Sequence, residues 1–162
     1  MVRPVIDVEY AGLYLSIGLS EYGYYVEEER REDNRYYLKA LKTPVKVEVI
    51  LASEGETLAA VVSMDYPSAI QVDVGEKPVE VEELEYTYSE TLNIPPYRVP
   101  VAIDVYVHEK ADSYVTLGVK LTADLRGVET PKDVLHILEI LYHFLLVQAD
   151  REQDAIDARH GR

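Results

Sequence analysis

The sequence contains no cysteine and no tryptophan, and phenylalanine occurs only once. The absence of cysteine excludes disulfide bonds, thiolate metal sites and cysteine nucleophiles. Positive charge is also scarce, since 16 Lys and Arg residues stand against 30 Asp and Glu residues and give a formal net charge of −14. Such a surface repels phosphate backbones and anionic lipid headgroups, so neither nucleic acid nor a membrane is expected as a partner.

A long uninterrupted apolar segment is missing as well. The most apolar stretch, residues 134–147, carries two histidines and a glutamate and is too short to span a bilayer. Asp7 and Glu9 follow the first residues without an apolar run of signal-peptide length, so a cytoplasmic protein is expected. Asparagine occurs twice and glutamine three times, a shortage of thermolabile amides that is typical of thermophilic proteins.

The fold class follows from the alternation of apolar and polar residues. At 162 residues with 48% hydrophobic content, the chain has the size of a single domain that can bury a core. Alternation with a period of two dominates up to about residue 126 and predicts strands, which short turns join in antiparallel pairs. We therefore expect an α+β fold with a mostly antiparallel, bulged and curled sheet of about seven to nine strands over 1–126. One long helix over 130–153 packs on it, and residues 154–162 form a frayed tail.

Several segments of the predicted sheet are less regular. Apolar residues change from even to odd positions at Ala11-Gly12, which predicts strand residues joined there by a β-bulge or a sharp bend, and Glu82-Glu83 is a second bulge candidate. Residues 20–42 are interpreted as a hairpin with a charged tip near Asp33-Asn34, with a short surface helix as the alternative. Residues 58–64 are apolar on both faces, which favours a central strand covered on both sides.

The C-terminal helix has the best-specified start in the chain. Thr130 is placed to cap the free amide groups, Pro131 suits the first helical position, and Asp133 complements the helix dipole. When successive residues are placed 100° apart around the helix axis, the polar side chains fall within a stripe of roughly 60°. Packing on one face of a sheet needs an apolar arc of only ~100° around the same axis. The rest of the helix is apolar and requires a further partner. The polar stripe comprises Lys132, His136, Glu139, His143 and Asp150.

Three partners would cover the surplus apolar surface: a sheet that curls around the helix, a second subunit, or an apolar ligand between helix and sheet. A curled antiparallel sheet that grips a C-terminal helix resembles the helix-grip layout of START-like lipid- and hormone-binding proteins. The order of strands and helix in an acidic chain is also similar to SecB-type chaperone subunits. The first resemblance implies a small apolar ligand, for which the candidate contacts are Tyr10, Tyr14, Leu138, Tyr142 and Leu145.

Two groups of polar residues are candidates for chemistry. His136, Glu139 and His143 lie on one side of the helix and include metal-ligating residue types, but the two histidines are roughly 10 Å apart, so a solvent-facing stripe is favoured. A second group, Asp104, His108, Glu109 and Asp112, gathers at the last hairpin, where polar residues are usual for solvation. Neither a nucleophile-elbow motif nor a phosphate-binding glycine loop occurs, and no cofactor is expected.

Tyrosine is the one compositional excess, with 14 residues, and seven of them precede Lys39. Tyrosine combines an apolar ring with a polar tip and is enriched at protein interfaces, although it also suits half-buried sheet faces. The preferred hypothesis is a non-catalytic protein that assembles with itself or with a protein partner, as a homo-oligomer and most simply a dimer. The alternatives are a helix-grip binder of a small apolar ligand and an enzyme whose site a single sequence does not reveal.

Overall fold

The computed structural model describes residues 6–74 and 83–159 and forms one antiparallel sheet with two helices. The sheet has seven strands in the order β1-β2-β3-β4-β7-β6-β5. The α+β class, the antiparallel sheet and the long C-terminal helix expected from the sequence are confirmed. The elements in chain order are α1 (Val8–Glu21), β1 (Tyr25–Glu32), β2 (Arg35–Lys42), β3 (Val45–Glu54), β4 (Thr57–Asp73), β5 (Tyr86–Ile94), β6 (Tyr97–Lys110), β7 (Tyr114–Val128) and α2 (Pro131–Arg159).

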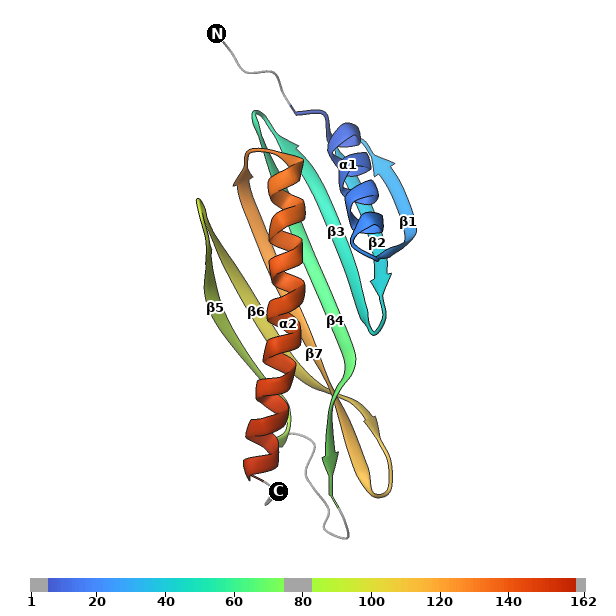
Figure 1. The fold of residues 1–162 in the computed structure, drawn as a ribbon, viewed down its shortest axis with the longest axis vertical. Coiled ribbons are helices and arrows are strands. Elements are labelled where there is room, and N and C mark those ends of the chain that lie inside the picture. Colours follow the sequence, from blue (N-terminus) through green and yellow to red (C-terminus); the bar gives the residue numbers. More distant parts are fainter. Residues whose placement is uncertain (1–5, 75–82, 160–162) are drawn as a thin grey trace.

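Helices and sheet form two layers (Figure 1). Both helices cover the same face of the sheet, with α2 running along β4 and β7 and α1 lying over β1 to β3. The opposite face carries no helix in the described part of the chain and is called the open face below. On β4, Val62 and Met64 point to the helices and are 0% exposed, whereas Val61 points to the open face and is 45% exposed. The strand is central as expected, but only one of its faces is covered.

The strand pairing follows the predicted turns where these are short. The charged tip at Asp33-Asn34 joins β1 to β2, so the hairpin interpretation is correct and the surface-helix alternative is wrong. Asp33 adopts φ 52°, a left-handed conformation that aspartate tolerates better than most residues. The bulge expected at Glu82-Glu83 lies partly outside the described residues, and the strand there begins at Tyr86.

The N-terminal segment differs from the expectation. In place of strand residues with a β-bulge or a sharp bend at Ala11-Gly12, residues 8–21 form helix α1, whose N-cap Asp7 accepts a 2.9 Å hydrogen bond from the Glu9 amide. The prediction failed because it followed only the large apolar residues. The small residues complete a buried stripe with the spacing of 3.6 residues per turn that defines a helix face. That stripe comprises Val8, Ala11, Gly12, Leu15, Gly18 and Leu19.

Helix α1 packs closely because two of its glycines face large side chains. A Cβ atom on Gly12 would lie 2.3 Å from Cγ of Tyr36 on β2, and one on Gly18 would lie 2.4 Å from Cδ2 of Leu135 on α2. Both distances are far below van der Waals contact, so the glycines set how near the helix approaches the sheet and α2. Part of the surplus apolar surface of α2 is thereby covered by α1, a partner that the sequence analysis did not include.

Helix α2 begins as predicted and ends later than predicted. The Thr130 hydroxyl accepts a 3.1 Å hydrogen bond from the Asp133 amide, and Pro131 is the first helical residue. The helix continues past residue 153 to Arg159, so most of the expected frayed tail is helical. Two contacts explain the extension: Ile156 is 1% exposed, and the Gln153 side-chain amide bonds both the N–H and the C=O of Gln71 on β4, each at 2.9 Å. Neither described helix has the length and apolar composition needed to cross a bilayer.

Candidate functional site

The outer surface of α1 carries four apolar side chains in one row, named here the outer α1 stripe: Tyr10, Leu13, Tyr14 and Ile17. Their spacing of three, four and seven residues places them on one helix face, opposite the buried stripe. Tyr10 is 61% exposed, Leu13 47% and Ile17 62%. The rings of Tyr10 and Tyr14 contact each other with centroids 6.4 Å apart. Helix α1 is therefore apolar on two faces. One face is packed on the protein, and on the other only Tyr14 is half-buried against the core.

Two more exposed tyrosines follow the helix in the chain but do not belong to the outer α1 stripe. Tyr22 is 48% exposed and Tyr25, the first residue of β1, is 70% exposed. Exposed large apolar residues scattered one by one are ordinary on soluble proteins, but a contiguous apolar patch marks an interaction surface. Of the eight large apolar residues that are exposed in the described chain, four lie on α1 or at its C-cap, one lies on α2, and three lie on the open face.

The charges that border the outer α1 stripe are acidic. Asp7 and Glu9 stand at the start of the helix and Glu21 at its end, all exposed, and no charged residue lies between Glu9 and Glu21. Glu9 forms an ion pair with Arg31 of β1 that ties the helix to the edge of the sheet. The stripe is thus an uncharged surface with carboxylates at both ends.

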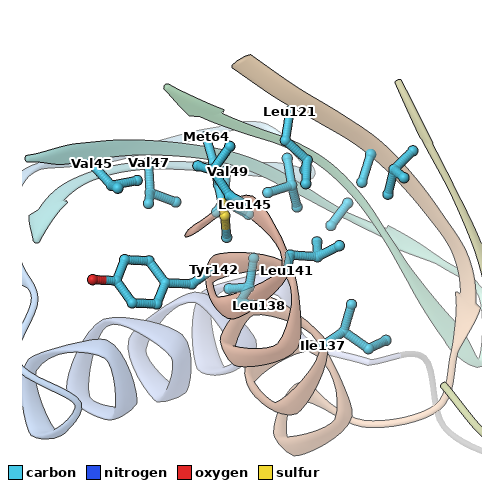
Figure 2. Close-up of a cluster of buried hydrophobic side chains, with 14 of the residues drawn as sticks. Val45, Val47, Val49, Met64, Leu121, Ile137, Leu138, Leu141, Tyr142 and Leu145 are labelled. Atoms are coloured by element: carbon cyan, nitrogen blue, oxygen red, sulfur yellow. The ribbon is translucent and has the colours of Figure 1, made fainter. Parts of the chain in front are cut away.

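The five candidate ligand contacts do not come together in one place. Tyr10 and Tyr14 belong to the outer α1 stripe, whereas Leu138, Tyr142 and Leu145 lie in the core between α2 and the sheet. Leu138 and Leu145 are 0% exposed and Tyr142 is 8% exposed. Figure 2 shows these α2 side chains directed at apolar residues of β3, β4 and β7. The facing residues labelled there are Val45, Val47, Val49, Met64 and Leu121.

The candidate metal ligands on α2 do not share one environment. His136 and His143 are exposed, and Nε2 of His143 lies 3.8 Å from an oxygen of Glu139. The Glu139 side chain is only 16% exposed, so it does not share the solvent-facing position of the histidines. Within residues 6–74 and 83–159, no three His, Asp or Glu side chains are grouped closely enough to hold a metal ion.

A polar cluster surrounds Glu139 where α2 meets the end of β2. The rings of Tyr24 and Tyr142 meet edge to face at 5.9 Å, and the Lys42 ammonium lies 4.5 Å from the Tyr142 ring centroid. The Tyr24 hydroxyl and Oε1 of Glu139 are buried without a hydrogen-bond partner. Burial, and then the Glu139 charge, raise the pKa of Tyr24 well above its ordinary value. Tyr24 is therefore neutral at physiological pH, and the cluster contains no activated nucleophile.

The open face holds a hollow of about 610 Å³ over β4, β5, β6 and β7. Tyr106 crosses Gly118 and donates a hydrogen bond to the Asp65 carboxylate, and Thr87 donates one to Asp104. Burial and the bond to Asp65 raise the pKa of Tyr106. Of the residues singled out at the last hairpin, Asp104 lines this hollow, while His108, Glu109 and Asp112 are exposed beyond it. The group is not assembled around a common point.

Comparisons of this chain with protein-family models, with curated proteins and with solved structures found no match. The outer α1 stripe is the strongest candidate site in the described part of the chain, and the sequence analysis missed it as a helix surface. The signal was present, because Tyr10, Leu13, Tyr14 and Ile17 have helical spacing. It was hidden because the same residues also fit a bulged pair of strands.

Proposed function

We propose that this protein is a non-catalytic interaction protein that binds another protein through the outer α1 stripe. The observation that carries the proposal is a helix with one face packed on its own sheet and a second apolar face exposed to solvent. Side chains at positions i, i+3, i+4 and i+7 of a helix are the anchors with which helices fill an apolar groove on a partner. The early tyrosines add large apolar contacts with polar tips, which are enriched at interfaces.

Charge favours a partner of opposite sign over a second copy at this surface. The stripe has carboxylates at both ends, Glu9 at one and Glu21 at the other. An antiparallel second copy would bring these acidic ends together, and each chain carries a formal charge of −14. We therefore assign the surface to a protein with an apolar groove bordered by Lys or Arg, for which the acidic ends provide complementary charge and faster association.

The packing between α2 and the sheet supports this function over the apolar-ligand alternative. The α2 side chains that would line a ligand cavity, Leu138 and Leu145, are fully buried against strand residues. Their apolar surface is already in contact with protein, so a ligand there would have to displace the core. An exposed apolar helix face needs no such rearrangement to bind.

The experiment compares binding by three forms of the immobilised full chain in an extract of the source cells. The forms are the wild type, Leu13→Glu/Ile17→Glu, and the control Ile50→Glu/Val147→Glu. The control removes two similarly exposed apolar residues, 40% and 46% exposed, one from the open face and one from α2. A protein retained by the wild type is then purified and titrated. We expect the stripe variant to bind it at least ~10-fold more weakly, which corresponds to about 1.4 kcal/mol, and the control to bind it normally.

Three results would count against this function. The first is that the stripe variant binds the retained protein with the same affinity as the wild type. The second is that the control variant loses as much affinity as the stripe variant, and the third is that the wild type retains no protein at micromolar concentrations. If the stripe variant instead lowers the mass of the isolated protein in sedimentation, the surface binds a second copy rather than another protein. Circular dichroism of each variant checks that the fold is intact, as expected for surface substitutions.

A further inference from the structure

The two edge strands of the sheet, β1 and β5, differ in how they are protected. Within residues 6–74 and 83–159, each pairs with one neighbour, β1 with β2 and β5 with β6. An edge strand presents a row of free N–H and C=O groups that another strand can pair with. Proteins that do not use such an edge interrupt it with charged side chains, prolines or bulges.

Strand β1 has two of these protections. Its sequence, YVEEERRE, is charged at six of eight positions, and its pairing with β2 is interrupted by a register shift between Val26 and Glu28. Arg30 also forms ion pairs with Glu28 and Glu32 of the same strand. A second strand would have to displace these charged groups from water, so β1 is an edge that discourages pairing.

Strand β5 has none of these protections. Its sequence, YTYSETLNI, contains a single charged residue, Glu90, and no proline. Its register with β6 is continuous from Tyr86 opposite Val105 to Ile94 opposite Tyr97, so it contains no bulge. The rings of Tyr86 and Tyr88 are stacked at 6.1 Å on the helix side. The strand is long, regular and nearly uncharged, which is the description of an edge that accepts another strand.

We propose that β5 pairs antiparallel with β5 of a second copy, about a two-fold axis that passes through Ser89, and so joins two seven-stranded sheets. A two-fold axis perpendicular to the sheet sets one residue opposite its own copy and keeps side chains of the same face together. With Ser89 on the axis, Thr87 lies opposite the partner's Thr91, and Tyr88 opposite the partner's Glu90. Tyr86 then lies opposite the partner's Leu92. Threonine pairs and aromatic–aliphatic pairs are favourable across strands.

Neighbouring registers are worse for reasons of charge and length. Moving the axis to Glu90 places that carboxylate against its own copy, and like charges directly opposite are destabilising. Moving it to Tyr88 leaves fewer β5 residues paired, because the described strand begins at Tyr86. The register about Ser89 pairs residues 86–92 and keeps the two Glu90 side chains from facing each other, whereas the equally long register about Thr91 leaves Tyr86 outside the paired segment.

The acidic character of the chain makes this contact sensitive to salt. Two copies with a formal charge of −14 repel each other, but at physiological ionic strength charges further apart than about 8 Å are largely screened. Since β5 itself carries one charge, the repulsion comes from distant groups. Raising the salt concentration should therefore strengthen the association, the opposite of what is expected for the complementary charges at the outer α1 stripe.

The absence of native cysteine permits a direct test. Residues directly opposite in an antiparallel pair have Cα atoms about 4.5–5.5 Å apart, within the range that a disulfide bridges. Ser89→Cys should therefore give a disulfide-linked dimer, of twice 18.4 kDa, under mild oxidation. The matched control is Ser113→Cys, because Ser113 is an exposed residue in the turn between β6 and β7. This variant should form at least ~10-fold less disulfide-linked dimer than Ser89→Cys under the same conditions.

The register has its own test. A mixture of Thr87→Cys and Thr91→Cys should give a mixed dimer much faster than either variant alone, because these residues are opposite each other across the axis. In the register about Glu90, Ser89 instead lies opposite the partner's Thr91, so the mixture of Ser89→Cys and Thr91→Cys would react fastest.

Sedimentation of the unmodified chain completes the experiment. We expect a dimer at about 100 μM protein and at least a ~10-fold weaker association for Ser89→Lys, which sets two like charges together at the axis. Ser89 is exposed, so the variant should fold, and circular dichroism checks this. The proposal is overturned if Ser89→Cys forms the disulfide-linked dimer no faster than Ser113→Cys does. It is also overturned if the wild type sediments as an 18.4 kDa monomer at that concentration. Leu13→Glu/Ile17→Glu should dimerise normally, so failure here is distinguishable from failure of the proposed function.

Discussion

Replacing Leu138 by alanine tests whether the space between α2 and the sheet is a packed core or a ligand cavity. Leu138 lies in the N-terminal half of α2, is 0% exposed, and faces apolar residues of β3 and β4 (Figure 2). The substitution removes three carbon atoms, whose transfer to water costs roughly 2 kcal/mol at ~0.8 kcal/mol per carbon. In a packed core a further penalty arises from the cavity left behind, because the neighbours relax only in part.

The packed arrangement therefore predicts a loss of about 3–5 kcal/mol in the free energy of unfolding. Guanidinium denaturation followed by circular dichroism measures it, and an unchanged m-value indicates that the unfolded state is unaffected. Val147→Ala on the same helix is the control, since Val147 is 46% exposed and should change stability by no more than about 0.5 kcal/mol. If Leu138→Ala lowers the free energy of unfolding by less than about 2 kcal/mol, the packed-core interpretation is wrong and a ligand cavity between α2 and the sheet is favoured instead.

Three further predictions concern the helices and one buried tyrosine. Gly12→Ala should lower stability by about 1–2 kcal/mol in thermal unfolding, because the contact of the new Cβ with Tyr36 outweighs the helix propensity gained. Thr130→Ala should cost about 0.5–2 kcal/mol by the same measurement, because the Asp133 amide loses its cap. Burial and the bond to Glu29 raise the pKa of Tyr36 to about 12, so the folded state holds this proton more tightly than the unfolded chain. Stability should fall as the pH rises from 10 to 12, and less steeply in Tyr36→Phe.

Each of these predictions has an opposite outcome. A more stable Gly12→Ala protein would mean that α1 does not approach Tyr36 as closely as described. A stable Thr130→Ala protein would mean that α2 is held by its packing alone. An alkaline stability profile that is identical in Tyr36→Phe would assign the loss to other tyrosines.

The strands were predictable where the pattern is local. Val45, Val47, Val49 and Leu51 alternate with Lys46, Glu48 and the exposed Ile50, and all four are at most 1% exposed in β3. A period of two is a property of the strand itself, so it is readable without knowing the neighbours. The start of α2 is local for the same reason, since Thr130, Pro131 and Asp133 act within one turn.

Helix α1 was not predictable in this way because two patterns fit the same residues. Large apolar side chains on both faces satisfy a bulged strand as well as a helix. The choice depends on Gly12 and Gly18, whose missing side chains leave room for Tyr36 and Leu135 from distant parts of the chain. That complementarity is a tertiary contact, and it also determines which face of α1 remains exposed.

The order of the strands and the protection of the edges likewise required the tertiary structure. Short turns identify neighbours such as β6 and β7, but the chain between β4 and β5 joins strands that do not pair, and β4 pairs with β7 instead. Only this crossover makes β5 an edge. The composition of β5, the alternation of the strands and the start of α2 could be read without the structure, because they depend on residues close in the chain. The packing of α1 and the exposure of β5 depend on residues far apart in the chain, and these were decided by the way the sheet assembles.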